Sequence, residues 1–272
     1  MYGESSGPPA SPPPDDRQCQ PQATGVGSMG RRQGTLARSK RVLVTGASRG
    51  IGRAVAVAAA EAGNDVALLG RDSPDLEAAA ASCRSVGDGD IALLPASVTD
   101  AVAVDRECRH LLDRWEGLDA LVNNAGLGRY APFMDLDESD WALMLNTNVL
   151  GLVNVTRAVL PSLTAQGHGH IVNMGSIRGL ETIPGTTAYA ASKFALVGLS
   201  LALRQELEGT GVLVSMVYPG GVKTDFGGID SETKDPTFLT PESIAEVIMD
   251  ILDRRPEAWV RDLTIMPSPA AG

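Results

Sequence analysis

The sequence predicts an α/β fold: one doubly wound parallel sheet of about seven strands with helices on both faces. Two observations lead to this prediction. From Arg41 onward, short apolar stretches alternate with longer stretches in which apolar residues recur at helical spacing. The composition is 43% hydrophobic but only 4% aromatic, so the core must consist of Ala, Val, Leu and Ile, which suits a buried parallel sheet.

The chain is expected to divide into a tail, residues 1–39, and one domain, residues 40–272. The tail holds six prolines, and Val26 and Leu36 are its only large aliphatic residues. Such a segment buries too little apolar surface to offset the entropy of ordering, so we expect it to be disordered. Met29 stays open as an alternative start.

Charge and cysteine content argue against several classes of function. The formal charge of −10 disfavours nucleic acid or an anionic membrane as a partner, because both attract clustered positive charge. The cysteines Cys19, Cys83 and Cys108 form no close pair, and no apolar run approaches the ~20 residues of a membrane span. We therefore expect a cytoplasmic protein. The one basic cluster is interpreted as a solvated edge before the first strand, with an anion-binding arm as the alternative; it consists of Arg31, Arg32, Arg38, Lys40 and Arg41.

The first strand, expected over residues 41–45 as a buried apolar run, leads through a glycine-rich turn into an Ala/Val-rich helix that ends near Gly63. Gly46, Gly50 and Gly52 in this turn have the spacing G-x-x-x-G-x-G. Glycine has no side chain to keep a pyrophosphate away from backbone N–H groups and the positive helix end, so the turn predicts a dinucleotide site. A tight turn with close helix packing is the alternative.

The second strand, residues 65–69, ends in Gly70-Arg71-Asp72. An arginine at this strand end suits the 2′-phosphate of NADP, whereas a carboxylate binds the ribose 2′-hydroxyl of NAD. Arg71 and Arg49, which lies in the glycine turn, are expected to bind that phosphate with charge-assisted hydrogen bonds. Asp72 can turn toward the ribose instead, but the two guanidinium groups favour NADP(H).

Three further elements, a helix over 74–85, a strand over 91–94 and a helix over 101–115, lead to a fourth strand over 118–122. This alternation implies a parallel sheet covered on both faces. Asn123-Asn124-Ala125-Gly126 follows the fourth strand. The two amides are expected to hydrogen-bond neighbouring strands and to floor the cofactor site, with a surface turn as the alternative.

The next helix, residues 140–165, is apolar around much of its circumference. Such a helix is buried on more than one face, which favours a subunit interface, with a fully covered core helix as the alternative. Asn148 lies within it, although an amide is a poor helix former and costs free energy when buried without partners.

A fifth strand, residues 170–174, is followed by Ser176 and by a helix over 188–208 that carries Tyr189 and Lys193. Residues four apart lie on one helix face, so the hydroxyl and the ammonium can reach one spot. A nearby ammonium favours the phenolate, which makes the phenol a better acid and, in the reverse direction, a usable base. Two amphipathic side chains with solvated tips are the alternative.

Strands over 212–217 and 259–265, with a helix over 241–254 between them, complete the sheet. Pro219-Gly220-Gly221-Val222-Lys223-Thr224 follows the sixth strand, and a loop of about fifteen residues comes next. His168 and His170 have no third ligand at metal-binding spacing, so we interpret them as polar residues at a strand edge.

Together these motifs resemble the short-chain dehydrogenase/reductase family in order and spacing, from about Arg41 to about Ile265. The shared motifs are Thr45-Gly46-x3-Gly50-x-Gly52, Asn123-Asn124-Ala125-Gly126, Asn148, Ser176, Tyr189-x3-Lys193 and Pro219-Gly220. The resemblance implies a Rossmann-type fold and an NADP(H)-dependent hydride transfer involving a small-molecule carbonyl or alcohol substrate. It also implies a homo-oligomer, either a tetramer or a dimer.

The resemblance implies a role for each catalytic residue. Tyr189 is expected to be the general acid or base, and Lys193 to lower its pKa and to hold the nicotinamide ribose. Ser176 is expected to bind the substrate oxygen where charge develops. Asn148 is expected to bend its helix and to hold a water that links Lys193 to bulk solvent.

The expected cofactor contacts run from the glycine turn to the segment after the sixth strand. They are Gly46, Ser48, Arg49, Gly50, Ile51, Gly52, Arg71, Ser97, Val98, Asn124, Ala125, Gly126, Tyr189, Lys193, Pro219, Gly220, Val222 and Thr224. Val222 and Thr224 are expected to seat the carboxamide. Ser97 stands where the family usually has an aspartate, so adenine contact is expected to be weaker or to rest on the backbone at Val98.

The substrate pocket is expected beside the loop over 225–239, lined by Ile177, Arg178, Ile183 and Phe226. Arg178 is interpreted either as a ligand for a substrate carboxylate or as a solvated surface arginine. The segment 258–267 lacks the double-glycine ending of ketoacyl-carrier-protein reductases and resembles the branch that acts on small hydroxy acids, serine-type substrates and assorted carbonyls.

Two other functions compete with this interpretation. A dinucleotide-sensing regulator that has lost its chemistry is expected to lack Tyr189, Lys193 or Ser176, and all three are present. An epimerase of the extended family needs a larger substrate domain than the fewer than fifty residues after Thr224 provide.

Overall fold

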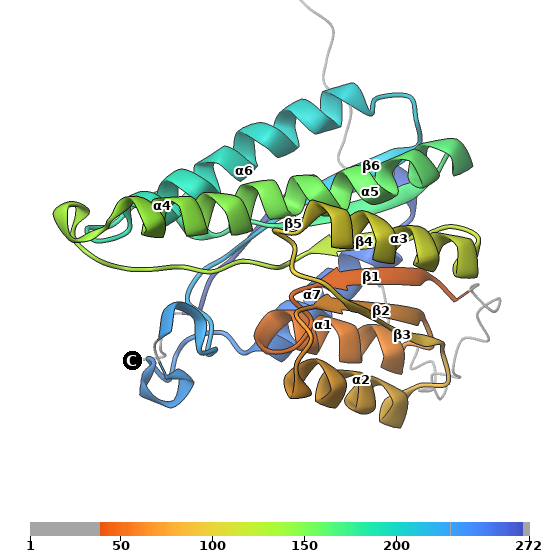
Figure 1. Ribbon diagram of the computed structural model, residues 1–272, viewed down its shortest axis with the longest axis horizontal. Coiled ribbons are helices and arrows are strands. Elements are labelled where there is room, and N and C mark those ends of the chain that lie inside the picture. Colours follow the sequence, from red (N-terminus) through yellow and green to blue (C-terminus); the bar gives the residue numbers. More distant parts are fainter. Residues whose placement is uncertain (1–38, 229, 269–272) are drawn as a thin grey trace, which may run out of the picture. The chain divides into compact units, whose positions relative to one another are not determined.

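The computed structural model describes residues 39–228 and 230–268, so the predictions for the tail, including Cys19 and Met29, lie outside the described residues. The described residues form one sheet of seven parallel strands in the order β3-β2-β1-β4-β5-β6-β7 (Figure 1). The strands are β1 Arg41–Thr45, β2 Asp65–Gly70, β3 Ile91–Pro95, β4 Ala120–Asn123, β5 Gly169–Met174, β6 Val212–Pro219 and β7 Asp262–Ile265. The predicted doubly wound α/β fold is therefore confirmed.

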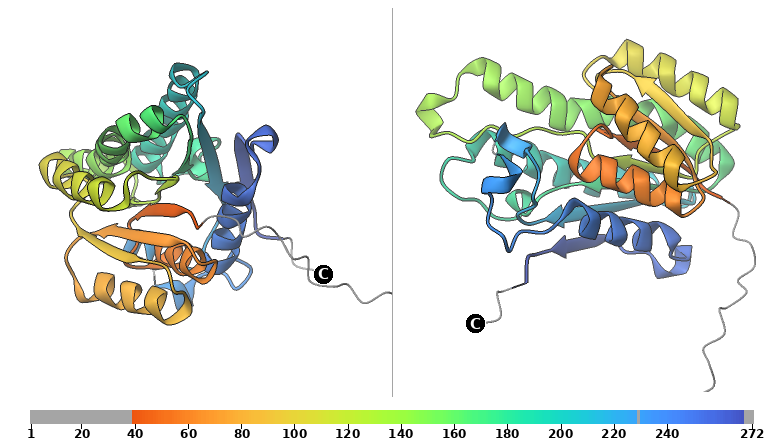
Figure 2. Two further views of the ribbon diagram at one scale, coloured as in Figure 1. Left: turned by 90° about the vertical axis from the view of Figure 1, so that its right-hand side faces the viewer. Right: turned by 90° about the horizontal axis from the view of Figure 1, so that it is seen from below.

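Helices cover both faces of the sheet (Figure 2). On one face lie α1 Gly50–Glu61, α2 Pro74–Val86 and α7 Pro241–Asp253; on the other lie α3 Ala101–Trp115, α5 Gly151–Gln166 and α6 Thr187–Glu206. Alternate residues of a strand point to opposite faces. In β1, Val42 and Val44 enter the first core and Leu43 enters the second, and all three are fully buried.

The winding of the chain reverses between β1 and β4. β1 pairs with β2 on one side and with β4 on the other, while the chain passes through β2 and β3 before it returns to β4. In open α/β sheets, ligands bind at the carboxyl ends of the strands at this switch point. The topology therefore brings the loops after β1 and β4 together at the position where a site is expected.

The predicted helix over 140–165 is continuous but irregular. It consists of α4 Glu138–Leu145, a π-helical segment η2 Asn146–Leu150, and α5. A π-helical segment widens the helical turn and breaks the regular hydrogen-bond ladder, and such segments are frequent at functional sites. Asn148 lies at its centre and is 1% exposed.

This helix is not covered on all sides. Leu143 is 52% exposed and Leu150 is 52% exposed, so the alternative of a fully covered core helix is wrong. By length and composition, Glu138–Gln166 would also suffice to cross a membrane, although its apolar residues form no long uninterrupted run. A helix that packs on the sheet of a soluble protein meets the same criterion, and α5 contributes Val155, Val159 and Leu163 to the second core.

Short 3₁₀ turns occur in the loops at the carboxyl ends of the strands and near the end of the described chain. They are η1 Phe133–Asp135, η3 Ile177–Gly179, η4 Phe226–Gly228, η5 Ser231–Thr233 and η6 Pro256–Ala258. The last of them shortens the final strand, which was predicted over 259–265 and begins at Asp262. Trp259 leaves the strand ladder and its indole N–H donates to Ser215 Oγ at 3.2 Å.

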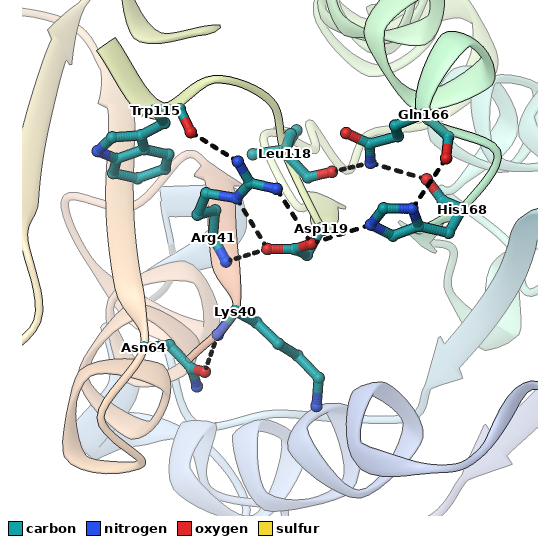
Figure 3. A network of polar contacts seen from close by, with 8 residues as sticks. All are labelled: Lys40, Arg41, Asn64, Trp115, Leu118, Asp119, Gln166 and His168. Carbon is teal, nitrogen blue, oxygen red and sulfur yellow. Dashed lines mark hydrogen bonds and ion pairs between the residues drawn. The ribbon is translucent and has the colours of Figure 1, made fainter. Parts of the chain in front are cut away.

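A polar network joins the amino ends of β1 and β4, at the edge of the sheet opposite the switch point (Figure 3). Asp119 Oδ2 accepts hydrogen bonds from the backbone N–H of Arg41 at 2.8 Å and from its Nε at 3.0 Å, and Arg41 Nη1 donates to the Trp115 carbonyl at 2.6 Å. Burial raises the pKa of Asp119, but the bonds from Arg41 outweigh this and lower it. Arg41 is only 8% exposed, so its interpretation as a solvated edge residue is wrong: Asp119 neutralises its charge.

Candidate active site

A cavity of about 900 Å³ lies at the carboxyl ends of the strands, between the loops that follow β1 to β6. Most of the predicted site residues line it. From that set they are Gly46, Ser48, Arg49, Gly50, Ile51, Arg71, Ser97, Val98, Asn124, Ala125, Gly126, Ser176, Tyr189, Lys193, Pro219, Gly220, Val222 and Thr224. Gly52 and Asn148 do not line the cavity. Gly52 packs against Gly46, and Asn148 binds Leu127, and both of these contacted residues line the cavity.

The glycine turn after β1 has a backbone that only glycine adopts easily. Gly46 has φ of +63° and Gly50 has φ of +55°, both in the left-handed region. A Cβ on Gly52 would lie 2.3 Å from the carbonyl oxygen of Gly46, so Gly52 permits α1 to pack directly against the turn. Arg49 is the N-cap of α1 and its side chain makes no capping hydrogen bond. The start of α1 thus has no side-chain cap, and its first residues, Gly50 and Ile51, line the cavity, which suits an anion site.

Amides at the end of β4 fix the position of this turn. Asn124 Nδ2 donates to the Thr45 carbonyl at 3.0 Å and to the Gly46 carbonyl at 3.3 Å. Asn123 Nδ2 donates to Asn173 Oδ1 on β5 at 2.9 Å. The prediction that these amides hydrogen-bond neighbouring strands is confirmed, and the alternative of a surface turn is wrong.

At one end of the cavity, two guanidinium groups are exposed to solvent. Arg49 follows β1 and Arg71 follows β2, and both line the cavity. Ser97 and Val98 follow β3, and the Val98 carbonyl accepts a hydrogen bond from Asn154 at 2.9 Å. This end therefore combines two positive charges with a backbone turn held in place by α5.

At the other end, Tyr189 is buried near the start of α6. The residue is 5% exposed, and the rings of Tyr130 and Phe226 contact its ring edge-on with centroids at 5.6 Å each. Burial, and secondarily the nearby Tyr130, raise the pKa of Tyr189, whereas a hydrogen bond with Ser176 and the charge of Arg178 lower it. Ser176 is the N-cap of η3, and its hydroxyl accepts a hydrogen bond from the Arg178 N–H at 3.1 Å. The hydroxyl groups of Tyr189 and Ser176 thus meet in the cavity wall.

Lys193 lies one helical turn after Tyr189 and is 5% exposed. Its Nζ donates to the carbonyl of Met174, at the end of β5, at 2.9 Å and lies 5.8 Å from the centroid of the Tyr189 ring. Burial lowers the pKa of Lys193 to about 8. The alternative that the tips of Tyr189 and Lys193 are both solvated is therefore wrong.

Asn148 braces the loop after β4 against α6. Its Oδ1 accepts from the Leu127 N–H at 2.8 Å, and its Nδ2 donates to the Leu127 carbonyl at 2.9 Å and to Ser192 Oγ at 2.9 Å. These bonds satisfy a buried amide in the middle of the π-helical segment. Ser192 precedes Lys193, so the contact positions the start of α6 relative to that loop.

Comparisons with known proteins agree with this geometry. A family model described as "short chain dehydrogenase" matches residues 40–235, which is more than half of the chain. The chain belongs to the short-chain dehydrogenase/reductase family. An NADP-dependent 3-hydroxy acid dehydrogenase of Schizosaccharomyces pombe is 34% identical over 244 residues, covering 86% of this chain and 94% of the relative. Sulfoacetaldehyde reductase 2 of Chromohalobacter salexigens is 39% identical over 238 residues, covering 84% of this chain and 94% of the relative.

Solved structures of the family share the fold. An alcohol dehydrogenase from Thermococcus sibiricus, complexed with 5-hydroxy-NADP, matches with a TM-score of 0.78 and 30% identity over 84% of this chain and 96% of that chain. The serine dehydrogenase from Escherichia coli matches with a TM-score of 0.73 and 32% identity over 82% of this chain and 96% of that chain.

This short-chain dehydrogenase also has cavity residues that the sequence did not single out. Tyr130, Leu143 and Lys234 line the cavity, whereas Ile183, which was predicted to line the pocket, does not and is 50% exposed. Tyr130 lies in the irregular segment after β4, and Lys234 lies in the loop after β6. The fold directs the loops after β1 to β6 to one edge, and that topological rule would have made both loops candidates.

Proposed function

We propose that the protein is an NADP(H)-dependent oxidoreductase that transfers a hydride between nicotinamide and a small alcohol or carbonyl compound. Hydroxy acids, ketones and related compounds are the proposed substrates, and Tyr189 is the proposed general acid or base. One observation carries the proposal: Tyr189, Ser176 and Lys193 line the same cavity as the glycine turn. The names of two relatives, a 3-hydroxy acid dehydrogenase that is NADP-dependent and a sulfoacetaldehyde reductase, support the same reaction class.

The residues present fit NADP(H). The uncapped start of α1, together with Gly46, Gly50 and Ile51 in the cavity lining, suits a pyrophosphate. Arg49 and Arg71 suit the 2′-phosphate that distinguishes NADP from NAD. When bound, the reduced cofactor supplies the hydride and the oxidised cofactor accepts it.

The remaining chemistry falls to three side chains. Ser176 donates a hydrogen bond to the substrate oxygen and stabilises the charge that develops there. Tyr189 gives a proton to the same oxygen during reduction and takes it back during oxidation. Burial raises the pKa of Tyr189, which keeps the phenol protonated for the reductive direction, while Ser176 and Arg178 oppose that shift. Lys193 adds a positive charge that favours the phenolate in the oxidative direction.

A proton relay through Asn148 is also part of the proposal. The π-helical segment around Asn148 interrupts the regular α-helical hydrogen-bond ladder, and we propose that a main-chain group of this segment binds a water. The Asn148 amide itself is occupied by Leu127 and Ser192, so the water is proposed to bind the backbone.

We further propose a cytoplasmic homo-oligomer, a dimer or a tetramer. Leu150 on η2 and Phe194 and Leu201 on α6 are 52%, 46% and 46% exposed, and a second copy of the chain would cover them. Cys83 and Cys108 are buried free thiols, which fits a reducing compartment.

The test is to supply NADPH or NADH with a panel of hydroxy acids, ketones and steroids in both directions, following the absorbance of the reduced nicotinamide. We expect turnover of at least one small compound, with NADPH preferred. NADPH binding without turnover of any compound would favour the dinucleotide-sensing regulator. Failure to bind either cofactor would contradict both functions.

A further inference from the structure

The cavity is basic although the protein is acidic. The described residues that line it include six cationic side chains and one carboxylate, that of Asp225, whereas the whole chain has a formal charge of −10. Clefts lined by one sign of charge attract ligands of the opposite sign. NADP(H) accounts for Arg49 and Arg71 at one end, so the remaining cations decide what else the cavity attracts.

Three of those cations are engaged elsewhere. Lys193 Nζ donates to the Met174 carbonyl at 2.9 Å. Lys234 Nζ donates to the carbonyls of Thr224 and Phe226. Hydrogen bonds with Thr237 lower the pKa of Asp235, in the loop after η5, and the charge of Lys223 adds to this effect, so Lys223 lies within electrostatic range of that carboxylate. Arg178 is the remaining cation, and it lies beside Ser176.

Arg178 lies two residues after Ser176, on the turn η3. Its side chain is 23% exposed, and within the described part of the chain its guanidinium makes one hydrogen bond, from Nη1 to Glu181 Oε1 at 3.4 Å. Glu181 has a side chain that is 62% exposed, and a long, exposed pair of this kind contributes little. Most donors of a largely buried guanidinium thus remain available to a ligand in the cavity.

Arg178 lies at the end of the cavity that holds Ser176 and Tyr189. Its backbone N–H donates to Ser176 Oγ at 3.1 Å, so the two residues belong to one rigid turn. Burial raises the pKa of Tyr189 and the charge of Arg178 partly opposes that rise, so the guanidinium lies within electrostatic range of the phenol. A planar guanidinium binds a carboxylate with two parallel hydrogen bonds.

We propose that Arg178 binds the carboxylate of an acidic substrate whose reacting carbonyl or hydroxyl oxygen is held by Ser176 and Tyr189. This inference rests on the proposed function and narrows its substrate class to small oxo and hydroxy acids. Glu181 occupies the guanidinium in the absence of substrate and is displaced when the acid binds. In this proposal Arg178 determines substrate specificity. Of its two interpretations, the proposal favours the carboxylate ligand over the solvated surface arginine.

The experiment compares an acid with its methyl ester, which removes the charge and keeps the reacting group. Binding of 3-hydroxybutyrate and methyl 3-hydroxybutyrate is measured by calorimetry on protein saturated with NADPH, where neither compound reacts. The kcat/KM for NADPH-dependent reduction of 3-oxobutanoate and its methyl ester is measured in parallel. The variants are Arg178→Gln, Arg178→Lys and Glu181→Gln, with Arg84→Gln, on the exposed end of α2, as the matched loss of charge.

The wild-type protein is expected to prefer the acid in both measurements. Arg178→Gln lowers the acid-to-ester ratio about 10- to 100-fold, as loss of a charged hydrogen-bonded pair predicts. Arg178→Lys keeps part of the ratio, Glu181→Gln raises it and Arg84→Gln leaves it unchanged. A wild-type protein that binds the ester as tightly as the acid, or a ratio that Arg178→Gln does not lower, overturns the inference. If no compound is turned over, the proposed function is overturned. The acid-to-ester ratio in the binding measurement then still tests the role of Arg178 separately.

Discussion

At the residue scale, Lys193 carries a charge into a nearly closed site. It is 5% exposed, and burial lowers its pKa to about 8 from an ordinary value of 10.5. A buried charge costs folding free energy unless its surroundings compensate it, and its Nζ donates one hydrogen bond, to the Met174 carbonyl. We interpret the folding free energy that this hydrogen bond does not compensate as the cost of placing the Lys193 ammonium beside Tyr189, where the proposed reaction uses it.

Lys193→Met is therefore expected to be inactive but more stable. The lowered pKa of Lys193 corresponds to a cost of about 3 kcal/mol in folding free energy, which the substitution removes. The substitution also removes the hydrogen bond to Met174, which stabilises the fold by about 1 kcal/mol. We therefore expect the variant to be more stable by about 1 to 2 kcal/mol at neutral pH. Because the folded pKa lies below the unfolded one, the cost is fully present below pH 8 and fades as the pH rises toward 10.5. Urea unfolding of both proteins at neutral and at alkaline pH measures this. A gain that persists unchanged at alkaline pH would contradict the explanation.

We also expect single residues to decide which cofactor the protein prefers. Arg71→Asp is expected to weaken NADPH binding about 100-fold, because it replaces an attraction to the 2′-phosphate by a repulsion, while NADH binding changes only a few-fold. Fluorescence titration of both cofactors measures the two constants, with Arg84→Gln as the control. Equal affinity of the unmodified protein for NADPH and NADH would remove the basis for this prediction.

Most polar residues that line the cavity could be predicted from the sequence, because each of them belongs to a motif with fixed spacing. Sequence reasoning missed Tyr130 and Lys234, which lie in irregular segments where no periodicity relates a residue to its neighbours. It also misjudged Arg41, because its partner Asp119 is distant in sequence and only strand pairing brings the two together.

At the element scale, the turn between β1 and α1 requires three segments to meet without side chains between them. Gly52→Ala would place a Cβ 2.3 Å from the Gly46 carbonyl oxygen and 2.4 Å from Asn124 Nδ2. We expect this variant to lose about 1 to 3 kcal/mol of stability by overpacking, and to bind NADPH at least about 10-fold more weakly. Thermal unfolding and cofactor titration measure both effects.

Glu61→Ala is the control for this substitution. Glu61 is the exposed last residue of the same helix, α1, so alanine there should change the stability by less than about 0.5 kcal/mol. Equal behaviour of the two alanine variants would show that the close approach at Gly52 does not constrain the turn.

The elements themselves were predictable to within a few residues at most ends, because the apolar periodicity is strong. The π-helical segment at Asn146–Leu150 was not predicted as such, since a widened turn leaves the apolar pattern almost unchanged. The bend expected at Asn148 came from the family resemblance and not from the periodicity. The start of β7 was misplaced because the Val260 carbonyl accepts a hydrogen bond from the Ser215 hydroxyl and the Trp259 indole donates to the same hydroxyl, so side-chain bonds and not the strand ladder hold this segment.

At the scale of the whole molecule, the exposed apolar residues of η2 and α6 predict self-association. Leu201→Glu, on the exposed side of α6, is expected to shift the protein from a dimer or tetramer to a smaller species, because it buries a charge in the contact. Val86→Glu is the control, since Val86 is 42% exposed on α2, which covers the other face of the sheet from α5 and α6. Light scattering after size exclusion measures the mass. A monomeric unmodified protein, or equal masses for the two variants, would contradict the predicted interface.

The central claim is that Tyr189 transfers the proton beside a bound nicotinamide, and Tyr189→Phe tests it most directly. This substitution removes one oxygen and keeps the ring that packs against Tyr130 and Phe226. The measurement is kcat for the best substrate of the panel together with the dissociation constant for NADPH. The account predicts that kcat falls at least about 100-fold while NADPH binding stays within about 3-fold. A variant that keeps the kcat of the unmodified protein would contradict it.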